Sequence, residues 1–87
     1  MRYLVWDEDK NDKLKKERGI SFEEVAELLF VGDILDVINN PSKNFPNQKV
    51  YVLKISGYVY YVPFVKDEEK IFLKTIIPSR KARKKYL

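Results

Sequence analysis

The segment from Tyr58 to Val65 is the part of this chain that most limits its fold. Its sequence, YVYYVPFV, is apolar at odd and even positions alike, so both faces of a strand built from it are apolar. Because side chains alternate between the two faces of a strand, such a run predicts a strand in the middle of a sheet. Pro63 has no N–H to donate to a neighbouring strand, so we expect a bulge or an unpaired position at this residue.

The sequence on either side of this segment predicts the other strands of an antiparallel sheet. Val50–Ile55 has the composition of a strand, and a two-residue turn at 56–57 (SG) joins it to the central strand as a hairpin. After a polar turn, a last strand is expected over Ile71–Ile77. The remaining segments are a strand at Arg2–Trp6, a short strand or turn at Asp33–Val37 and a loop at Asn39–Gln48.

Two helices are predicted ahead of the hairpin. Asp7 is a typical N-cap for a helix over Glu8–Arg18, and Gly19 suits the left-handed residue that ends a helix. Residues 21–24 (SFEE) form a capping box, in which two side chains satisfy each other's free backbone N–H groups. The second helix runs to about Val31, and one of its faces is apolar through Phe22, Val25, Ala26 and Leu29.

Together these patterns predict a single α+β domain over residues 1–87. Two N-terminal helices are expected to pack on one side of an antiparallel sheet of four to five strands. Ser79–Leu87, which follows the last strand, is expected to form a short basic helix or a tail. At 87 residues, the chain has no room for a second domain.

The residue types that are missing exclude several kinds of chemistry. The chain has no cysteine and no histidine, which rules out disulfides, thiolate nucleophiles and the zinc sites that need these residues. We therefore expect no metal and no cofactor. No apolar signal-peptide core follows Met1, and no run approaches the ~20 apolar residues that span a bilayer, so we expect a cytoplasmic protein without a membrane segment.

The charge of the chain is divided unevenly between its two halves. The net charge is +4, but residues 1–40 carry −4 and residues 41–87 carry +8. The last eight residues contain five cations and no anion. This asymmetry favours a polyanionic partner, most plausibly nucleic acid, that contacts the C-terminal side. The alternative is a solvated tail that only keeps the protein soluble.

Two motifs stand near the ends of the chain. The first is Trp6–Asn11 (WDEDKN) followed by Lys16–Val25 (KERGISFEEV), and the second is Thr75–Tyr86 (TIIPSRKARKKY). In this order and at this spacing, they resemble the W-D-x-x-K-N…K-H-G-[VI]-S-F-E-E-A opening and the R-I-I-S-A-R-x-A-T-x-x-E-R-x-x-Y close of BrnT-type toxins. The resemblance spans the whole chain and is specific at its two ends.

This resemblance implies a small RelE-like α+β ribonuclease of a type II toxin–antitoxin pair, which slows translation by cutting RNA. It also implies a cognate antitoxin, encoded nearby, that neutralises the toxin and binds operator DNA. The chain departs from the family motifs at three places. Arg18 stands where the family has histidine, Thr75 with Lys74 beside it where the family has arginine, and Pro78-Ser79-Arg80 where it has S-A-R.

RNA cleavage without a metal ion needs a deprotonated 2′-OH, stabilisation of the phosphorane charge, and a proton or cation for the leaving 5′-oxygen. Arg80 and Arg83 are expected to clamp the phosphate, and Lys10 to add positive charge. A tyrosine or lysine of depressed pKa is expected to act as the base, and Tyr86 is expected to be a catalytic residue. The other residues predicted to bind RNA are Lys13, Arg18, Lys74, Lys81, Lys84, Lys85 and Tyr61.

These residues also have a purely structural interpretation. The tyrosines can pack in the core, and Arg80 and Arg83 can belong to a solvated helix face. The sequence thus leaves two functions open: a toxin ribonuclease, and a non-catalytic module that binds nucleic acid or an antitoxin. Candidates for an exposed apolar patch that contacts a partner are Tyr3, Trp6, Phe45 and Pro46.

Overall fold

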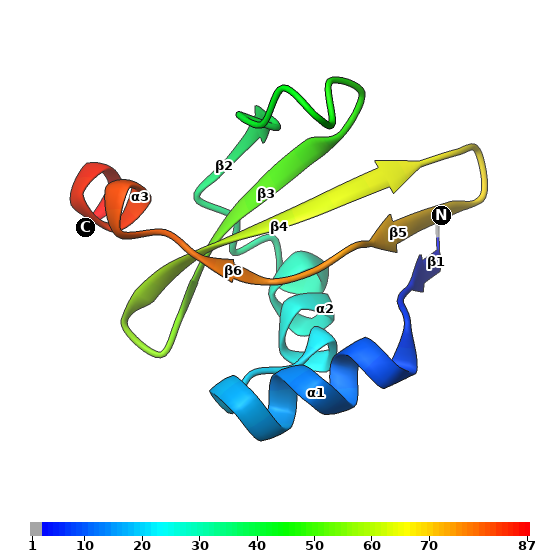
Figure 1. The fold of residues 1–87 in the computed structure, drawn as a ribbon, viewed down its shortest axis with the longest axis horizontal. Helices are drawn as coiled ribbons and strands as arrows, with labels where there is room; N and C mark the ends of the chain where they lie inside the picture. Colours follow the sequence, from blue (N-terminus) through cyan, green and yellow to red (C-terminus); the bar gives the residue numbers. More distant parts are fainter. Residues whose placement is uncertain (1–2) are drawn as a thin grey trace.

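A single sheet with helices on both faces makes up the fold, as Figure 1 shows. The structure, a computed structural model, describes residues 3–87, so Arg2 of the expected N-terminal strand lies outside the described residues. In that described part of the chain, no helix is long and apolar enough to cross a membrane. The elements are β1 (Tyr3–Val5), α1 (Glu8–Arg18), α2 (Phe22–Val31), β2 (Asp36–Asn39), β3 (Lys49–Ile55), β4 (Tyr58–Lys66), β5 (Lys70–Leu73), β6 (Ile77–Pro78) and α3 (Arg80–Tyr86).

The sheet is mixed, which corrects the expectation of an antiparallel sheet. Its strand order is β1-β5-β4-β3-β2, and β6 pairs with β4 beyond the end of β5. β1 lies parallel to β5, and the Tyr3 N–H donates to the Glu69 carbonyl at 2.9 Å beside this pairing. The other described pairings are antiparallel. A tight turn forces antiparallel pairing, but most of the chain lies between β1 and β5, so no turn fixes their relative direction.

Pro63 lies at a bulge in the sheet, as the sequence predicts. β5 leaves β4 after Leu73 and β6 rejoins it at Ile77 with a register that differs by one residue, so an extra residue bulges out between them. The Pro63 carbonyl accepts from the Lys74 N–H at 2.8 Å, and the proline nitrogen faces this same interrupted edge. The strand expected over Ile71–Ile77 is therefore divided in two.

The hairpin between β3 and β4 turns through Ser56 and Gly57, as predicted. Their φ angles of 52° and 80° are both in the left-handed region, as a type I′ turn requires. The turn fixes a register in which Val50 lies opposite Pro63 and Val52 opposite Tyr61. These two pairs share one face of the sheet because directly paired residues of neighbouring strands point the same way.

Both faces of the sheet are covered, which explains why β4 is apolar on both sides. α1 and α2 cover one face, where Phe22 and Val25 are fully buried against β3 and β4. α3 covers part of the opposite face, where the fully buried Ala82 packs on Val52 and Val59. The basic C-terminal segment is thus a helix, and it lies on the other side of the sheet from the first two helices.

The helix ends follow the predicted signals, with one difference. Asp7 accepts hydrogen bonds from two backbone N–H groups of the first turn of α1, and Gly19 ends this helix at φ 66°. Ser21 caps α2 by accepting from the Glu24 N–H at 3.2 Å. The Glu24 carboxylate accepts from the Ser21 hydroxyl at 3.4 Å rather than from its backbone N–H, so half of the expected capping box forms.

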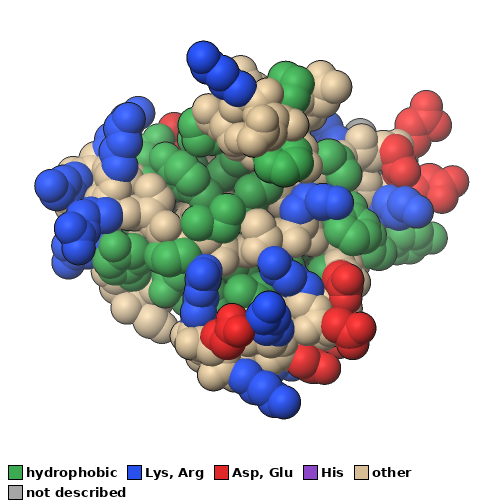
Figure 2. All heavy atoms as spheres, in the orientation of Figure 1, with side chains coloured by type: hydrophobic (Ala, Val, Ile, Leu, Met, Phe, Trp, Pro, Cys, Tyr) green, Lys and Arg blue, Asp and Glu red, His purple; other side chains and the backbone are tan. Residues whose placement is uncertain are grey.

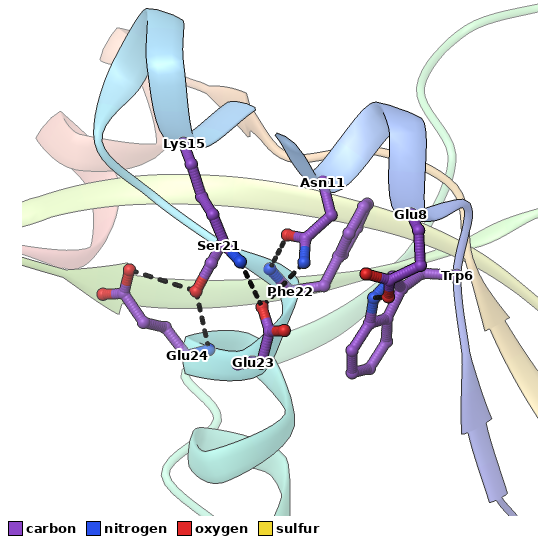
Figure 3. Close-up of polar contacts among 8 residues, drawn as sticks. All are labelled: Trp6, Glu8, Asn11, Lys15, Ser21, Phe22, Glu23 and Glu24. Atoms are coloured by element: carbon purple, nitrogen blue, oxygen red, sulfur yellow. Dashed lines mark hydrogen bonds and ion pairs between the residues drawn. The ribbon is translucent and has the colours of Figure 1, made fainter. Parts of the chain in front are cut away.

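The buried side chain of Asn11 joins α1 to the start of α2 (Figure 3). Its carbonyl oxygen accepts from the Phe22 N–H at 2.8 Å, and its amide group donates to the Glu23 carboxylate at 2.7 Å. The amide is the largest cause of a lowered pKa at Glu23, with a smaller contribution from Lys15 at 3.6 Å. Asn11 thereby satisfies a helix N–H that has no partner within α2.

Replacing Asn11 tests how much of the stability depends on this contact. Asn11→Ala should lower the free energy of unfolding by about 2–3 kcal/mol, because it leaves the buried Phe22 N–H without an acceptor. Lys15→Ala, which removes only the exposed ion pair with Glu23, should change it by less than about 1 kcal/mol. Urea unfolding followed by the fluorescence of Trp6 measures both changes. Equal midpoints for Asn11→Ala and wild type would contradict this role.

Candidate nucleic-acid interface

Four polar side chains of α1 share one face of that helix. Lys10, Lys13 and Glu17 are separated by three and four residues, which places them on neighbouring turns of one side, and Arg18 follows Glu17 at the margin of that side. They line a pocket of about 390 Å³ between α1 and the segment that leads from β5 to β6. This basic pocket is lined by Lys10, Lys13, Leu14, Glu17, Arg18, Thr75 and Ile77.

Arg18 ties the end of α1 to the bulged part of the sheet. Its guanidinium group donates to the Ile76 carbonyl at 2.9 Å, and the Ile76 side chain is fully buried in the core. This bond uses one of the five N–H donors of the guanidinium, so the others remain able to bind an anion. The contact brings the two terminal motifs together, since Arg18 belongs to the first motif and Ile76 to the second.

A second depression lies on the sheet face that carries α3. It has a volume of about 310 Å³ and an almost entirely apolar lining. Two of the predicted RNA-binding residues, Tyr61 and Lys74, contribute to it, and the Lys74 ammonium lies 4.8 Å from the centre of the Phe72 ring. This apolar groove is lined by Asn40, Pro41, Ser42, Phe45, Gln48, Val50, Tyr61, Pro63, Lys74, Thr75 and Ile77.

The basic pocket and the apolar groove adjoin along the bulge. Thr75 and Ile77 line both of them, so the segment between β5 and β6 forms their common wall. Arg80, the first residue of α3, follows Ile77 by three residues, which is at most about 11 Å of extended chain. Figure 2 shows the result from one side: Lys and Arg side chains gather over α3 and alternate with Asp and Glu side chains over α1, with hydrophobic side chains between the two helices.

The cations of α3 are exposed to solvent, while its apolar side packs on the sheet. Ser79 caps the helix by accepting from the Ala82 N–H at 3.1 Å. The Arg83 guanidinium lies 5.6 Å from the centre of the Tyr58 ring, close enough for a cation–π interaction. The exposed cations of this helix are Arg80, Lys81, Arg83, Lys84 and Lys85.

Tyr86 is held by a carboxylate rather than poised to take up a proton. Its hydroxyl donates to Asp36 of β2 at 2.5 Å. This hydrogen bond is the largest of the causes that raise the pKa of Tyr86 to about 12, and the same bond lowers the pKa of Asp36. A general base needs the opposite shift, so the expectation of a depressed pKa does not fit Tyr86.

The predicted residues therefore fall into three adjoining places. Lys10, Lys13 and Arg18 meet in the basic pocket, Tyr61 and Lys74 line the apolar groove, and the remaining ones lie on α3. Glu17 was not among the predicted residues, although its spacing of seven from Lys10 is a signal that it shares their helix face. Within residues 3–87, no cluster of acidic side chains has an arrangement that could hold a metal ion.

The fold and this surface define a small α+β domain with a cationic site beside an apolar groove. The family model described as "Ribonuclease toxin, BrnT, of type II toxin-antitoxin system" matches residues 6–85. The chain therefore belongs to the BrnT family of toxins, which confirms the resemblance of its two terminal motifs. No curated protein and no solved structure gives a match.

Removing the Tyr86 hydroxyl gives a pH-dependent test of its bond to Asp36. The lowered pKa of Asp36 contributes stability above its ordinary value of 3.8, which is lost as the pH falls through the lowered pKa. The raised pKa of Tyr86 contributes stability below its ordinary value of 10.0, which is lost as the pH rises to about 12. Wild type should therefore be more stable than Tyr86→Phe at neutral pH, and the difference should shrink at both extremes.

Urea unfolding of both proteins across the pH range measures this difference. A spectrophotometric titration adds an independent readout, because the absorbance step at about 12 should be missing in Tyr86→Phe. A constant stability difference at every pH would show that the hydroxyl contributes through packing alone.

Proposed function

We propose that this chain is the toxin of a type II toxin–antitoxin pair and inhibits translation by cutting RNA without a metal ion. The observation that carries the proposal is the basic pocket. It brings Lys10 and Arg18 of the first motif, together with Lys13 between them, against Thr75 of the second motif, within a chain that belongs to a family of ribonuclease toxins. Three cations around one pocket suit a group that gains negative charge, as a phosphate does during cleavage.

The cations have distinct parts in the proposed reaction. Arg18, fixed by its bond to the Ile76 carbonyl, presents its remaining N–H groups to the non-bridging phosphate oxygens. Lys10 and Lys13 neutralise the phosphorane, and either can give a proton to the leaving 5′-oxygen. Arg80 and Arg83 on α3 hold the RNA strand by its neighbouring phosphates and thereby align the 2′-OH for attack.

Glu17 is the side chain best placed to act as general base. Among the described residues that line the basic pocket, it is the one carboxylate. In the proposed step it takes the proton of the 2′-OH as that oxygen bonds to phosphorus, and the bond from phosphorus to the 5′-oxygen breaks. The products are a 2′,3′-cyclic phosphate and a free 5′-hydroxyl. The hydrogen bond from Tyr86 to Asp36 favours the protonated phenol, so Tyr86 is a poor base. We therefore assign proton transfer from the 2′-OH to Glu17.

Two double variants test the assignment of the cations. Lys10→Ala/Lys13→Ala and Arg80→Ala/Arg83→Ala should each slow the cleavage of ribosome-free RNA by about 100-fold or more, since each removes charge that stabilises or aligns the phosphate. The matched control is Lys15→Ala/Lys16→Ala, which removes the same charge from α1 outside the pocket and should cleave like wild type. Denaturing gels of the products give the rates.

Growth assays extend this test to the cell. Expression of the wild type without a partner should arrest a bacterial host, and both double variants should relieve the arrest. If the wild type leaves RNA intact in vitro and does not affect growth, the ribonuclease assignment is wrong.

Glu17 calls for a separate measurement. Glu17→Gln should lower the cleavage rate by about 100-fold or more, because a general base typically contributes 10²–10⁴. Its affinity for RNA should stay the same or rise, since a negative charge has been removed. Asp12→Asn, which neutralises an exposed carboxylate elsewhere on α1, serves as the control. Equal cleavage by Glu17→Gln and wild type would exclude Glu17 as the base.

The proposed partners follow from the same function. The toxin is expected to act in the cytoplasm on RNA and to be neutralised by a cognate antitoxin encoded beside it. Contact with operator DNA would be made through that antitoxin. Co-expression with the neighbouring reading frame should restore growth and yield a stable complex on purification.

A non-catalytic module remains the second candidate, favoured by two observations. Thr75 replaces a basic residue of the family motif inside the pocket, and Tyr86 has a raised rather than a depressed pKa. Such a module would bind RNA with an affinity that falls steeply with salt and would give no products in the same gels.

A further inference from the structure

We propose that the apolar groove is a subsite for one unpaired nucleobase of the RNA substrate. The inference rests on the proposed function, because it assumes that a phosphate of the same RNA occupies the basic pocket. The groove would bind a base of the RNA, whereas the basic pocket would bind only its phosphate backbone.

The lining of the groove suits the flat face of a base. Val50 and Pro63 are buried beneath it, and Tyr61 presents an aromatic ring beside them. Phe45 and Ile77 are 50% and 44% exposed, so both present apolar surface that a ligand in the groove can cover. Aromatic side chains stack on bases of every kind, and this stacking adds to the affinity that cations provide by binding the phosphates of single-stranded nucleic acid.

The rim of the groove offers hydrogen-bonding groups for the edge of a base. The Asn40 side chain donates to the Gln48 side-chain oxygen at 3.2 Å and accepts from the Ser42 N–H at 2.9 Å. These bonds order the loop that carries Phe45. Because Gln48 uses its oxygen here, its amide N–H groups are the part that can donate to a ligand. Thr75, whose side chain carries a hydroxyl, belongs to the wall shared with the basic pocket.

Size and charge favour a base over a segment of protein. A volume of about 310 Å³ is at the low end of the ~300–1,000 Å³ of ligand sites, and it suits one ring system rather than a helix ~10 Å across. Lys74 lies at one side of the groove, and Lys10, Lys13 and Arg18 lie beyond the shared wall. A base in the groove would thus have cations nearby for the phosphates that flank it.

The experiment uses a single-stranded oligonucleotide in which every sugar is 2′-O-methylated, so that binding is measured without cleavage. Phe45→Ala should weaken binding by about 5- to 150-fold, the range expected for loss of one stacked base, and should leave the salt dependence unchanged. Phe30→Ala is the matched control, because Phe30 is 79% exposed on α2 outside the groove. Phe45→Trp should retain the affinity of the wild type, which separates stacking from a change in folding.

Abasic oligonucleotides, each lacking one base, identify the ligand. One of these abasic oligonucleotides should bind wild type as weakly as the complete oligonucleotide binds Phe45→Ala. The same abasic oligonucleotide should bind Phe45→Ala and wild type with equal affinity. If wild type cleaves RNA while Phe45→Ala binds and cleaves equally well, the base subsite is wrong and the proposed function stands. If wild type neither binds nor cleaves RNA, both are wrong. Unchanged RNA binding by Phe45→Ala together with lost antitoxin binding would assign the groove to the protein partner instead.

Discussion

The buried carboxamide of Asn11 is the contact on which the arrangement of the N-terminal half depends. α1 is almost entirely polar, and Asn11 and Leu14 are its buried residues, so little apolar surface is available to orient it. The two hydrogen bonds between Asn11 and the start of α2 fix the orientation of α1 relative to α2, which burial of Leu14 alone would not do. Because Asn11 and Leu14 are buried, Lys10, Lys13 and Arg18 lie beside the bulged segment. At the C-terminal end of α1, the hydrogen bond from Arg18 to the Ile76 carbonyl fixes the helix to this segment.

The proline in the central strand has a comparable effect on the other side of the site. Pro63 lacks the N–H that a regular strand would donate at this edge of β4. Opposite it, the neighbouring chain has one extra residue between β5 and β6. A regular strand over these residues would point Lys74 and Thr75 to opposite faces. In the bulge, both side chains line the apolar groove, and Thr75 also lines the basic pocket. The bulge expected at Pro63 therefore forms the wall that the basic pocket and the apolar groove share.

The sequence predicts what depends on neighbouring residues, and it misses what depends on contacts between distant ones. Caps at Asp7 and Gly19, the hairpin turn and the bulge at Pro63 are local, and the structure contains all of them. The parallel pairing of β1, the face of the sheet chosen by α3 and the meeting of Arg18 with Ile76 join parts of the chain far apart in sequence. No local pattern encodes those contacts. The sequence therefore proposes candidate residues, but it does not predict their division among a pocket, a groove and a helix.

The two basic positions at which this chain departs from its family are neighbours in space. Arg18 takes the place of the family's histidine and Thr75 that of its arginine, and both line the basic pocket. The guanidinium of Arg18 donates to the carbonyl of Ile76, the residue directly after Thr75. Compared with the family motifs that it resembles, this chain thus has a guanidinium on α1 in place of the imidazole and no arginine at position 75. A guanidinium binds phosphate but keeps its proton near neutral pH. An imidazole can bind phosphate and can also gain or lose a proton in this pH range. On the proposed function, Arg18 therefore binds the phosphate while another group transfers the proton, and Glu17 is the carboxylate among the described residues that line the pocket.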